Sequence, residues 1–194
     1  MKYEPQNFEK LLGLEGFSDT LLKNHFTLYQ GYVTNTNKVS DLLSSFAKEE
    51  KTGTPEYAEL KRRFGWEFNG MRLHEYYFGN MTKKVEEPDA SPKLIKKIES
   101  DFGSYDAWEK DFKATGAMRG IGWVILAHDV ETGHLFNIWV NEHDIGHLAG
   151  TESILVMDVF EHAFMIDYGL KKADYIDAFF RAIAWKTLEE RFAK

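Results

Sequence analysis

The fold of this chain is decided by the segment ILVMDVFEHAF, residues 154–164. Its apolar run has the length of a strand and ends at Asp158, with His162 four residues later. A carboxylate at the exit of a buried strand is costly unless a cation faces it, and a metal ion that also binds the histidine would serve. The spacing alone favours a plainer arrangement, in which Asp158 starts a helix and His162 is solvated. The rest of the chain has to separate the two interpretations.

Composition excludes several classes of protein. Of the 194 residues, 43% are hydrophobic and 15% aromatic, which is ample for a buried core. The formal net charge is −7 and the basic residues are scattered among acids, so we expect no nucleic-acid partner. No apolar run could span a bilayer, and the first ten residues, MKYEPQNFEK, lack the apolar centre of a signal peptide. We therefore expect no membrane partner and a cytoplasmic location.

The absence of cysteine restricts any metal chemistry. It removes disulfides, thiolate metal sites, iron–sulfur clusters and thiol nucleophiles together. Any metal ion here must be bound by His, Asp, Glu or water.

Two long helices are predicted in the N-terminal half. Residues 18–47 repeat apolar groups at three- and four-residue spacing, which predicts one helix. A polar turn follows, and a second helix is expected from about residue 55 to 81, interrupted or bent near Gly65 or Gly70, where glycine weakens a helix. The short polar connection favours an antiparallel hairpin.

The C-terminal half mixes helices and strands. The segment VEEPDASP, residues 85–92, is charged and bears prolines, so we place a boundary there, between a helical hairpin domain (1–87) and an α/β domain (88–194). Within the second domain we expect helices at 92–101 and 104–117, strands at 121–127, 135–140 and 154–159, and one or two helices within 173–192. The predicted class is α+β, with a three-stranded antiparallel sheet.

The histidines offer competing candidates for metal ligands. They are His25, His74, His128, His134, His143, His147 and His162. His143 and His147 have the spacing of one helix face, but Gly146 between them indicates a loop, so joint ligation is the weaker interpretation. His128 and His134 bracket the turn of the predicted β-hairpin, where solvent-facing polar residues are expected.

His25 and His74 differ from the other histidines because each lies in the apolar-rich part of its helix. Antiparallel packing could bring them together near the middle of the hairpin. Taken singly, each is more typical of a hydrogen-bonded core residue than of a ligand.

Four motifs follow one another along the chain: QGYVTNTN at 30–37, LHEYYF at 73–78, GW at 122–123 and DVFEHAF at 158–164. The last is similar to D-x-W-E-H-A-Y, the signature of the iron/manganese superoxide dismutases. The others resemble that family's T-Y-V-x-N-L-N, N-H-x-x-F/Y-W and G-W segments. The chain thus resembles this family over essentially its whole length.

The resemblance implies a metal site and a reaction. His25, His74, Asp158 and His162 would bind one iron or manganese ion, with water or hydroxide in a fifth position. The implied substrate is superoxide, which the enzyme would convert to oxygen and hydrogen peroxide in two alternating one-electron steps. Three imidazoles and one carboxylate suit a first-row ion that cycles between 2+ and 3+ charge.

The resemblance also implies roles for Tyr32 and His143. Tyr32 would be the phenol at the mouth of the substrate channel, and His143 would tune the metal-bound water through a hydrogen bond. Tyr32 follows His25 by seven residues, whereas the family usually has eight. Seven residues of α-helix return to nearly the same face, so we predict a regular first helix without a π-bulge.

Metal preference and assembly are further expectations from the resemblance. Gly70 is typical of manganese members, but His143 matches some iron members and Val156 replaces a glycine common in manganese enzymes, so iron or activity with either metal is favoured. Glu161 would reach His162 of a second subunit, in a homodimer or homotetramer. The family's usual His–Tyr contact at that interface is replaced here by Leu28 or Tyr29 and by Met165.

Two alternative functions stay open at this point. One is a non-catalytic, structural member of the same fold, which the presence of all four ligand candidates disfavours. The other is a different mononuclear non-heme iron enzyme that uses two histidines and one carboxylate.

Overall fold

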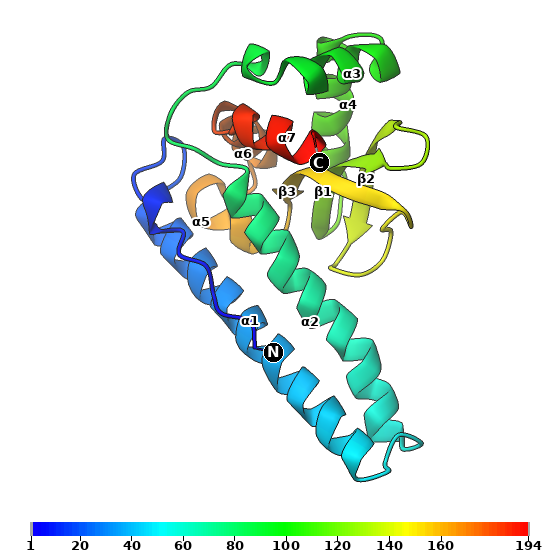
Figure 1. Cartoon of the computed structure of the whole chain (residues 1–194). Coiled ribbons are helices and arrows are strands. Elements are labelled where there is room, and N and C mark those ends of the chain that lie inside the picture. The colour runs from blue at the N-terminus through cyan, green and yellow to red at the C-terminus, as the bar shows by residue number, and fades with distance from the viewer. Residues whose placement is uncertain (1, 194) are drawn as a thin grey trace.

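A long helical hairpin carries a mixed layer of strands and short helices at one end (Figure 1). The computed structural model describes residues 2–193. The helices are α1 (Asp19–Lys48), α2 (Pro55–Gly79), α3 (Pro92–Phe102), α4 (Tyr105–Ala117), α5 (Met165–Tyr168), α6 (Lys172–Arg181) and α7 (Trp185–Phe192). The strands are β1 (Gly122–Asp129), β2 (Leu135–Asn141) and β3 (Thr151–Asp158), and short 3₁₀ turns lie at Glu9–Leu11, Pro88–Ala90 and Glu161–Ala163. The predicted α+β class is confirmed.

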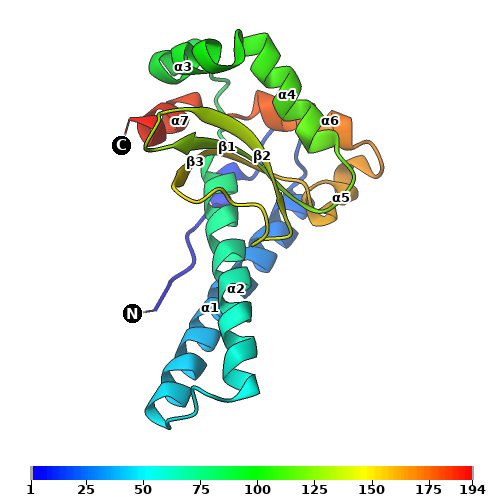
Figure 2. The ribbon, with the colours of Figure 1, turned by 90° about the vertical axis from the view of Figure 1, so that its right-hand side faces the viewer.

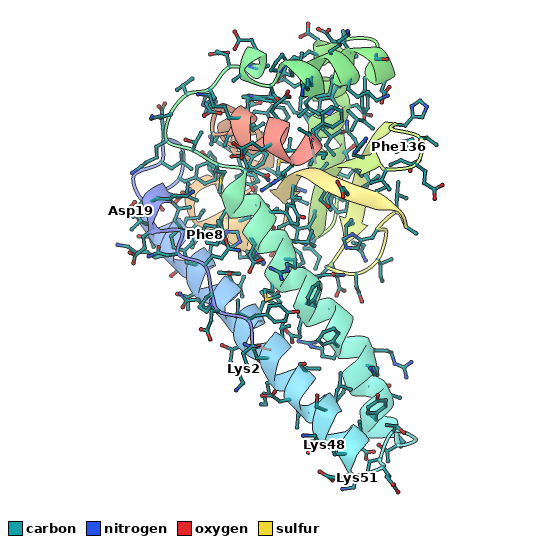
Figure 3. All side chains as sticks on the ribbon, viewed as in Figure 1. Lys2, Phe8, Asp19, Lys48, Lys51 and Phe136 are labelled. Carbon is teal, nitrogen blue, oxygen red and sulfur yellow. The ribbon has the colours of Figure 1, made fainter. Side chains whose placement is uncertain are left out.

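Helix α1 begins where its sequence provides a cap. The Ser18 side chain accepts a hydrogen bond from the backbone N–H of Leu21 at 3.1 Å, which satisfies one free amide of the first turn. The helix is α-helical from Asp19 to Lys48, so the predicted absence of a π-bulge is confirmed for this segment. The tip of the hairpin, between Lys48 and Lys51, lies far from the sheet (Figure 3).

Helix α2 is continuous through both of its interior glycines, so the predicted interruption at Gly65 or Gly70 is wrong, while the alternative, a bend there, stays a prediction. A glycine costs a helix only about 1 kcal/mol relative to alanine, which tertiary packing can override. At Gly70 the packing is specific, because a Cβ there would lie 2.5 Å from Cδ1 of Tyr32. This glycine allows the Tyr32 ring to lie against α2.

The three strands form one antiparallel sheet in the order β2-β1-β3. The β1–β2 hairpin and the third strand are therefore confirmed. In Figure 2, α3, α4, α6 and α7 lie on one side of this sheet and the hairpin lies on the other. Asp158 pairs with Trp123 at the end of β3, next to α2.

The buried core runs without interruption from the hairpin into the sheet and its covering helices. One polar link joins the two parts where α2 ends, because the Asn80 side-chain amide donates to the carbonyl oxygen of Val156 at 2.5 Å. The division of the chain into domains at residues 1–87 and 88–194 stays a prediction. No helix among residues 2–193 combines the length and the apolar character needed to cross a membrane.

Candidate metal centre

Four side chains from four separate segments converge between the hairpin and the sheet. They are His25 of α1, His74 of α2, Asp158 at the end of β3 and His162 of the 3₁₀ turn that follows. One donor atom from each lies within 4.8 Å of all the others. The sequence motifs, more than a hundred residues apart at their extremes, therefore meet at one point.

Asp158 lies at the centre of this group. Its Oδ2 atom is 3.2 Å from Nε2 of His25, 3.2 Å from Nε2 of His162 and 3.7 Å from Nε2 of His74. Its other oxygen, Oδ1, accepts the backbone N–H of Phe160 at 2.8 Å. The carboxylate is thus oriented so that one oxygen faces the three imidazoles.

The histidines present unsatisfied nitrogen atoms to the same point. Nδ1 of His74 lies 2.5 Å from the carbonyl oxygen of Gly70, so Nδ1 carries the proton and Nε2 keeps its lone pair. Nε2 of His74 is buried without a hydrogen-bond partner within residues 2–193, and so is Nε2 of His25, the ring nitrogen that faces Oδ2 of Asp158. Buried polar atoms are rarely left unpaired, so these orphan nitrogens fit a metal ion.

The electrostatics of the group also suit metal binding. Burial lowers the pKa of His25 and, more strongly, that of His74, so both rings are neutral at pH 7. Burial alone would raise the pKa of Asp158, but the neighbouring His162 and His25 outweigh it and lower that pKa far below its usual range. Neutral imidazoles and an ionised carboxylate are the protonation states that a metal ion requires.

A hydrogen-bonded chain lies beside the four ligands. The hydroxyl of Tyr32 is 2.8 Å from Nε2 of His143, and Nε1–H of Trp123 donates to Nδ1 of His143 at 3.0 Å. The Tyr32 ring stacks on His74, with centroids 5.1 Å apart at 29°. Tyr32 and His143, which come from opposite halves of the chain, are therefore brought together next to a ligand.

Aromatic rings surround the site. Phe78 and Trp123 are fully buried and contact His25 and His74, with ring centroids 4.9 and 5.0 Å apart respectively. The Phe160 ring stacks on His162 at 5.1 Å. Such an apolar surround excludes water and strengthens electrostatic interactions at the metal position.

The other histidines do not join the centre. His128 lies at the end of β1 against Phe192, and His134 lies in the turn before β2, near Asp101. His143 and His147 lie in a loop, where a ring nitrogen of His147 contacts the carbonyl oxygen of His143 at 2.9 Å. The loop interpretation of this pair is confirmed.

Trp66 was not singled out from the sequence, although it contacts the Tyr32–His143 pair. Its ring centroid is 4.5 Å from that of His143 and 5.5 Å from that of Tyr32. A signal was available, because residues 66, 70 and 74 are spaced four apart and share one face of α2.

Comparison with known proteins identifies the family. Residues 90–191 match the family described as "Iron/manganese superoxide dismutases, C-terminal domain". A superoxide dismutase [Fe] of Aquifex pyrophilus is 38% identical, and the alignment covers 100% of this chain and 92% of that protein. A superoxide dismutase [Mn] 2 of Haloferax volcanii is 34% identical, over 87% of this chain and 83% of that protein. With relatives of this similarity along its whole length, the chain belongs to the iron/manganese superoxide dismutase family, and it is a superoxide dismutase.

Proposed function

We propose that Tyr32 delivers protons beside the metal during dismutation of superoxide, and that His143 positions the Tyr32 hydroxyl. When bound by the four ligands, an iron or manganese ion supplies one-electron chemistry between its 2+ and 3+ states. The complete reaction converts two superoxide anions and two protons into oxygen and hydrogen peroxide. The protein residues must therefore supply protons to a buried site.

The observation that carries this proposal is the hydrogen bond between Tyr32 and His143. The indole of Trp123 can only donate, so Nδ1 of His143 must be an unprotonated acceptor. Burial lowers the pKa of His143 to about 4, so the ring is neutral at pH 7 and its proton is on Nε2. Nε2–H then donates to the Tyr32 oxygen. The phenolic hydrogen of Tyr32 is left free to point toward a substrate or a water molecule.

Tyr32 is suited to keep that proton until it is needed. Burial, followed by the charges of Asp158 and Glu67, raises the pKa of its phenol well above the usual value. The phenol is therefore protonated throughout the physiological range and can donate a hydrogen bond. We infer that it passes a proton to reduced substrate and is reprotonated from solvent, with His143 holding its oxygen in place.

We propose iron as the preferred metal, or activity with either ion. The support is the imidazole of His143, which offers one N–H and is anchored by Trp123, and Val156, which lies in β3 two residues before the Asp158 ligand. The relatives include both iron and manganese enzymes, so the metal has to be decided by measurement.

We propose an isologous homodimer, with a homotetramer as the alternative, in which Glu161 contacts His162 of the second subunit. Glu161 is exposed, and the His162 side chain is the one ligand with appreciable exposure, at 29%. Met165, four residues after Glu161, is 40% exposed. The hydroxyl of Tyr29, in contrast, donates to Glu75 at 2.9 Å inside the hairpin. An apolar contact at Met165 in place of a polar one would leave no buried group unpaired.

A cytoplasmic location is proposed on the composition alone.

The test is metal analysis together with superoxide-dismutation activity, for the wild type and for His74→Ala. Stoichiometric iron or manganese is expected in the wild type, and the variant should lose metal and activity together because it lacks a ligand. His128→Ala, which changes a histidine away from the centre, is the matched control and should retain both. Reconstitution with each metal separately decides the preference. A fully metal-loaded wild type without activity would contradict the assignment.

A further inference from the structure

We propose that Trp66 is a positioning residue for this reaction. Through its hydrogen bond to Glu142 it keeps the His143 ring in place relative to the Tyr32 hydroxyl. The inference rests on the roles proposed above for Tyr32 and His143. It assigns a function to a hydrogen bond between the hairpin and the loop after β2.

Trp66 contacts both members of the pair and the residue that precedes one of them. Its Nε1–H donates to Oε2 of Glu142 at 2.9 Å. Its ring packs edge-on against His143, at 4.5 Å between centroids and 70° between planes. The Trp66 side chain thus contacts both the His143 ring and Glu142, the residue just before it in the chain.

The loop that carries His143 needs such support. Backbone hydrogen bonds between Asn141 and Ile145, at 2.7 and 3.3 Å, close a tight turn around it. Within this turn Glu142 has a φ of 51°, in the left-handed region that is unfavourable for glutamate. This conformation directs the next residue, His143, into the interior, where its side chain is fully buried. The Trp66 hydrogen bond therefore acts at the residue whose conformation aims His143.

Trp66 is itself held from its other side. The guanidinium of Arg63 lies over its ring at 4.1 Å, and the same guanidinium pairs with Glu67 at 2.7 Å. A ring held between a cation and an imidazole has little rotational freedom. It can therefore transmit the position of α2, which also carries the ligand His74, to the His143 loop.

Substitutions can separate the hydrogen bond from the packing. Trp66→Phe keeps an aromatic ring but has no N–H to donate, and Glu142→Ala removes the acceptor while leaving the indole intact. Glu142→Gln keeps an oxygen that can accept the same bond. Trp139→Phe is the matched control, because it removes the N–H of another half-buried tryptophan that lies under a cation, Lys172.

Steady-state kinetics of the metal-loaded enzymes provide the first measurement. In Trp66→Phe and Glu142→Ala we expect kcat to fall about three- to tenfold, less than the hundredfold that a 1 Å misplacement can cost. Because access of substrate is unchanged, kcat/KM should stay within about twofold, and Glu142→Gln should restore kcat. Equal kcat values in Trp66→Phe, Trp139→Phe and the wild type would overturn the proposal.

The second measurement does not depend on activity. The full-length protein is loaded with gallium(III), a diamagnetic substitute for iron(III), and its tryptophan indoles are labelled with ¹⁵N. The Trp123 indole N–H bonds His143 directly, so its resonance should shift in Trp66→Phe and Glu142→Ala. The Trp185 resonance serves as the internal reference and should not move. An unmoved Trp123 resonance would refute the positioning role. If the Trp123 resonance moves but Tyr32→Phe leaves kcat unchanged, only the proton-delivery role is refuted.

Discussion

The hydroxyl of Tyr32 and Nε2 of His143 lie 2.8 Å apart, although 111 residues separate them in the chain. One comes from the hairpin and the other from the loop after β2, so the pair exists only when the two parts of the molecule are packed together. Tyr32 is 9% exposed and His143 is fully buried. The pair therefore places a protonated phenol between solvent and the metal ligands.

Replacing Tyr32 with phenylalanine should slow proton delivery without removing the metal. The ring and its stacking on His74 remain, but the hydroxyl is lost. General acid catalysis contributes about 10²- to 10⁴-fold in typical enzymes, and because water can substitute in part we expect kcat to fall by about tenfold or more. Metal content and kcat/KM should be nearly unchanged. Pulse radiolysis at high superoxide concentration measures the effect, and an unchanged kcat would contradict the role of the phenol.

The two interior glycines of α2 should respond in opposite ways to alanine. At Gly70 a Cβ would meet the Tyr32 ring at 2.5 and 2.7 Å, so Gly70→Ala should destabilise the fold by about 1–3 kcal/mol and displace the phenol. At Gly65 no atom lies within 4 Å of the added carbon, so Gly65→Ala should stabilise the helix by about 1 kcal/mol. Urea unfolding monitored by circular dichroism compares the two, and equal effects would show that Tyr32 is not packed against Gly70.

The same glycines show what local sequence can and cannot predict. Apolar periodicity was sufficient for α1 and α2 as helices, because it reports which face is buried. The predicted interruption at Gly65 or Gly70 was wrong because tertiary packing can keep a helix continuous through a glycine. At Gly70 the packing partner is the ring of Tyr32, which lies 38 residues away in sequence. Short turns such as Glu161–Ala163 and α5 were not predicted, since three or four residues carry no periodic signal.

The site was predictable only in part from the residues themselves. Asp158 and His162 stand out by their position after an apolar run, but His25 alone is indistinguishable from a core histidine. Its assignment came from the family resemblance, and the unpaired ring nitrogens of the folded chain support it independently. Trp66 was missed because its hydrogen bond to Glu142 depends on how α2 and the loop after β2 are packed.

His143 should make the protein more sensitive to acid. Burial lowers the pKa of this ring to about 4 in the folded state, against about 6.5 in the unfolded chain. As the pH falls below 6.5, the unfolded chain takes up a proton on this ring, whereas the folded protein does so only near pH 4. The free energy of unfolding therefore falls as the pH falls from 6.5 through 4. The shift corresponds to about 3 kcal/mol once the ring is protonated in both states.

The comparison that isolates this effect is wild type against His143→Gln, whose amide does not titrate in this range. Between pH 7.5 and pH 4.5 the free energy of unfolding should fall by about 2–3 kcal/mol more in the wild type than in the variant. Both proteins are measured with a chelator present, so that release of metal does not contribute. Parallel pH dependences would show that His143 is protonated as easily in the folded protein as in the unfolded chain.

Glu161 should be needed for assembly more than for folding of one subunit. It is exposed next to the partly exposed ligand His162, and the apolar side chains of Met165, Ile166 and Leu170 are exposed nearby in the chain. Removing one partner of a buried charged hydrogen bond costs about 2–5 kcal/mol, so Glu161→Ala should raise the Kd of the proposed dimer by about 30-fold or more. Sedimentation velocity over a range of concentrations measures this, with Glu131→Ala, in the turn between β1 and β2, as the control for loss of an exposed carboxylate. A contact across the dimer would orient the imidazole of His162, so metal retention should fall in parallel with dissociation. A monomer that keeps its metal and full activity would show that the second subunit contributes nothing to the site.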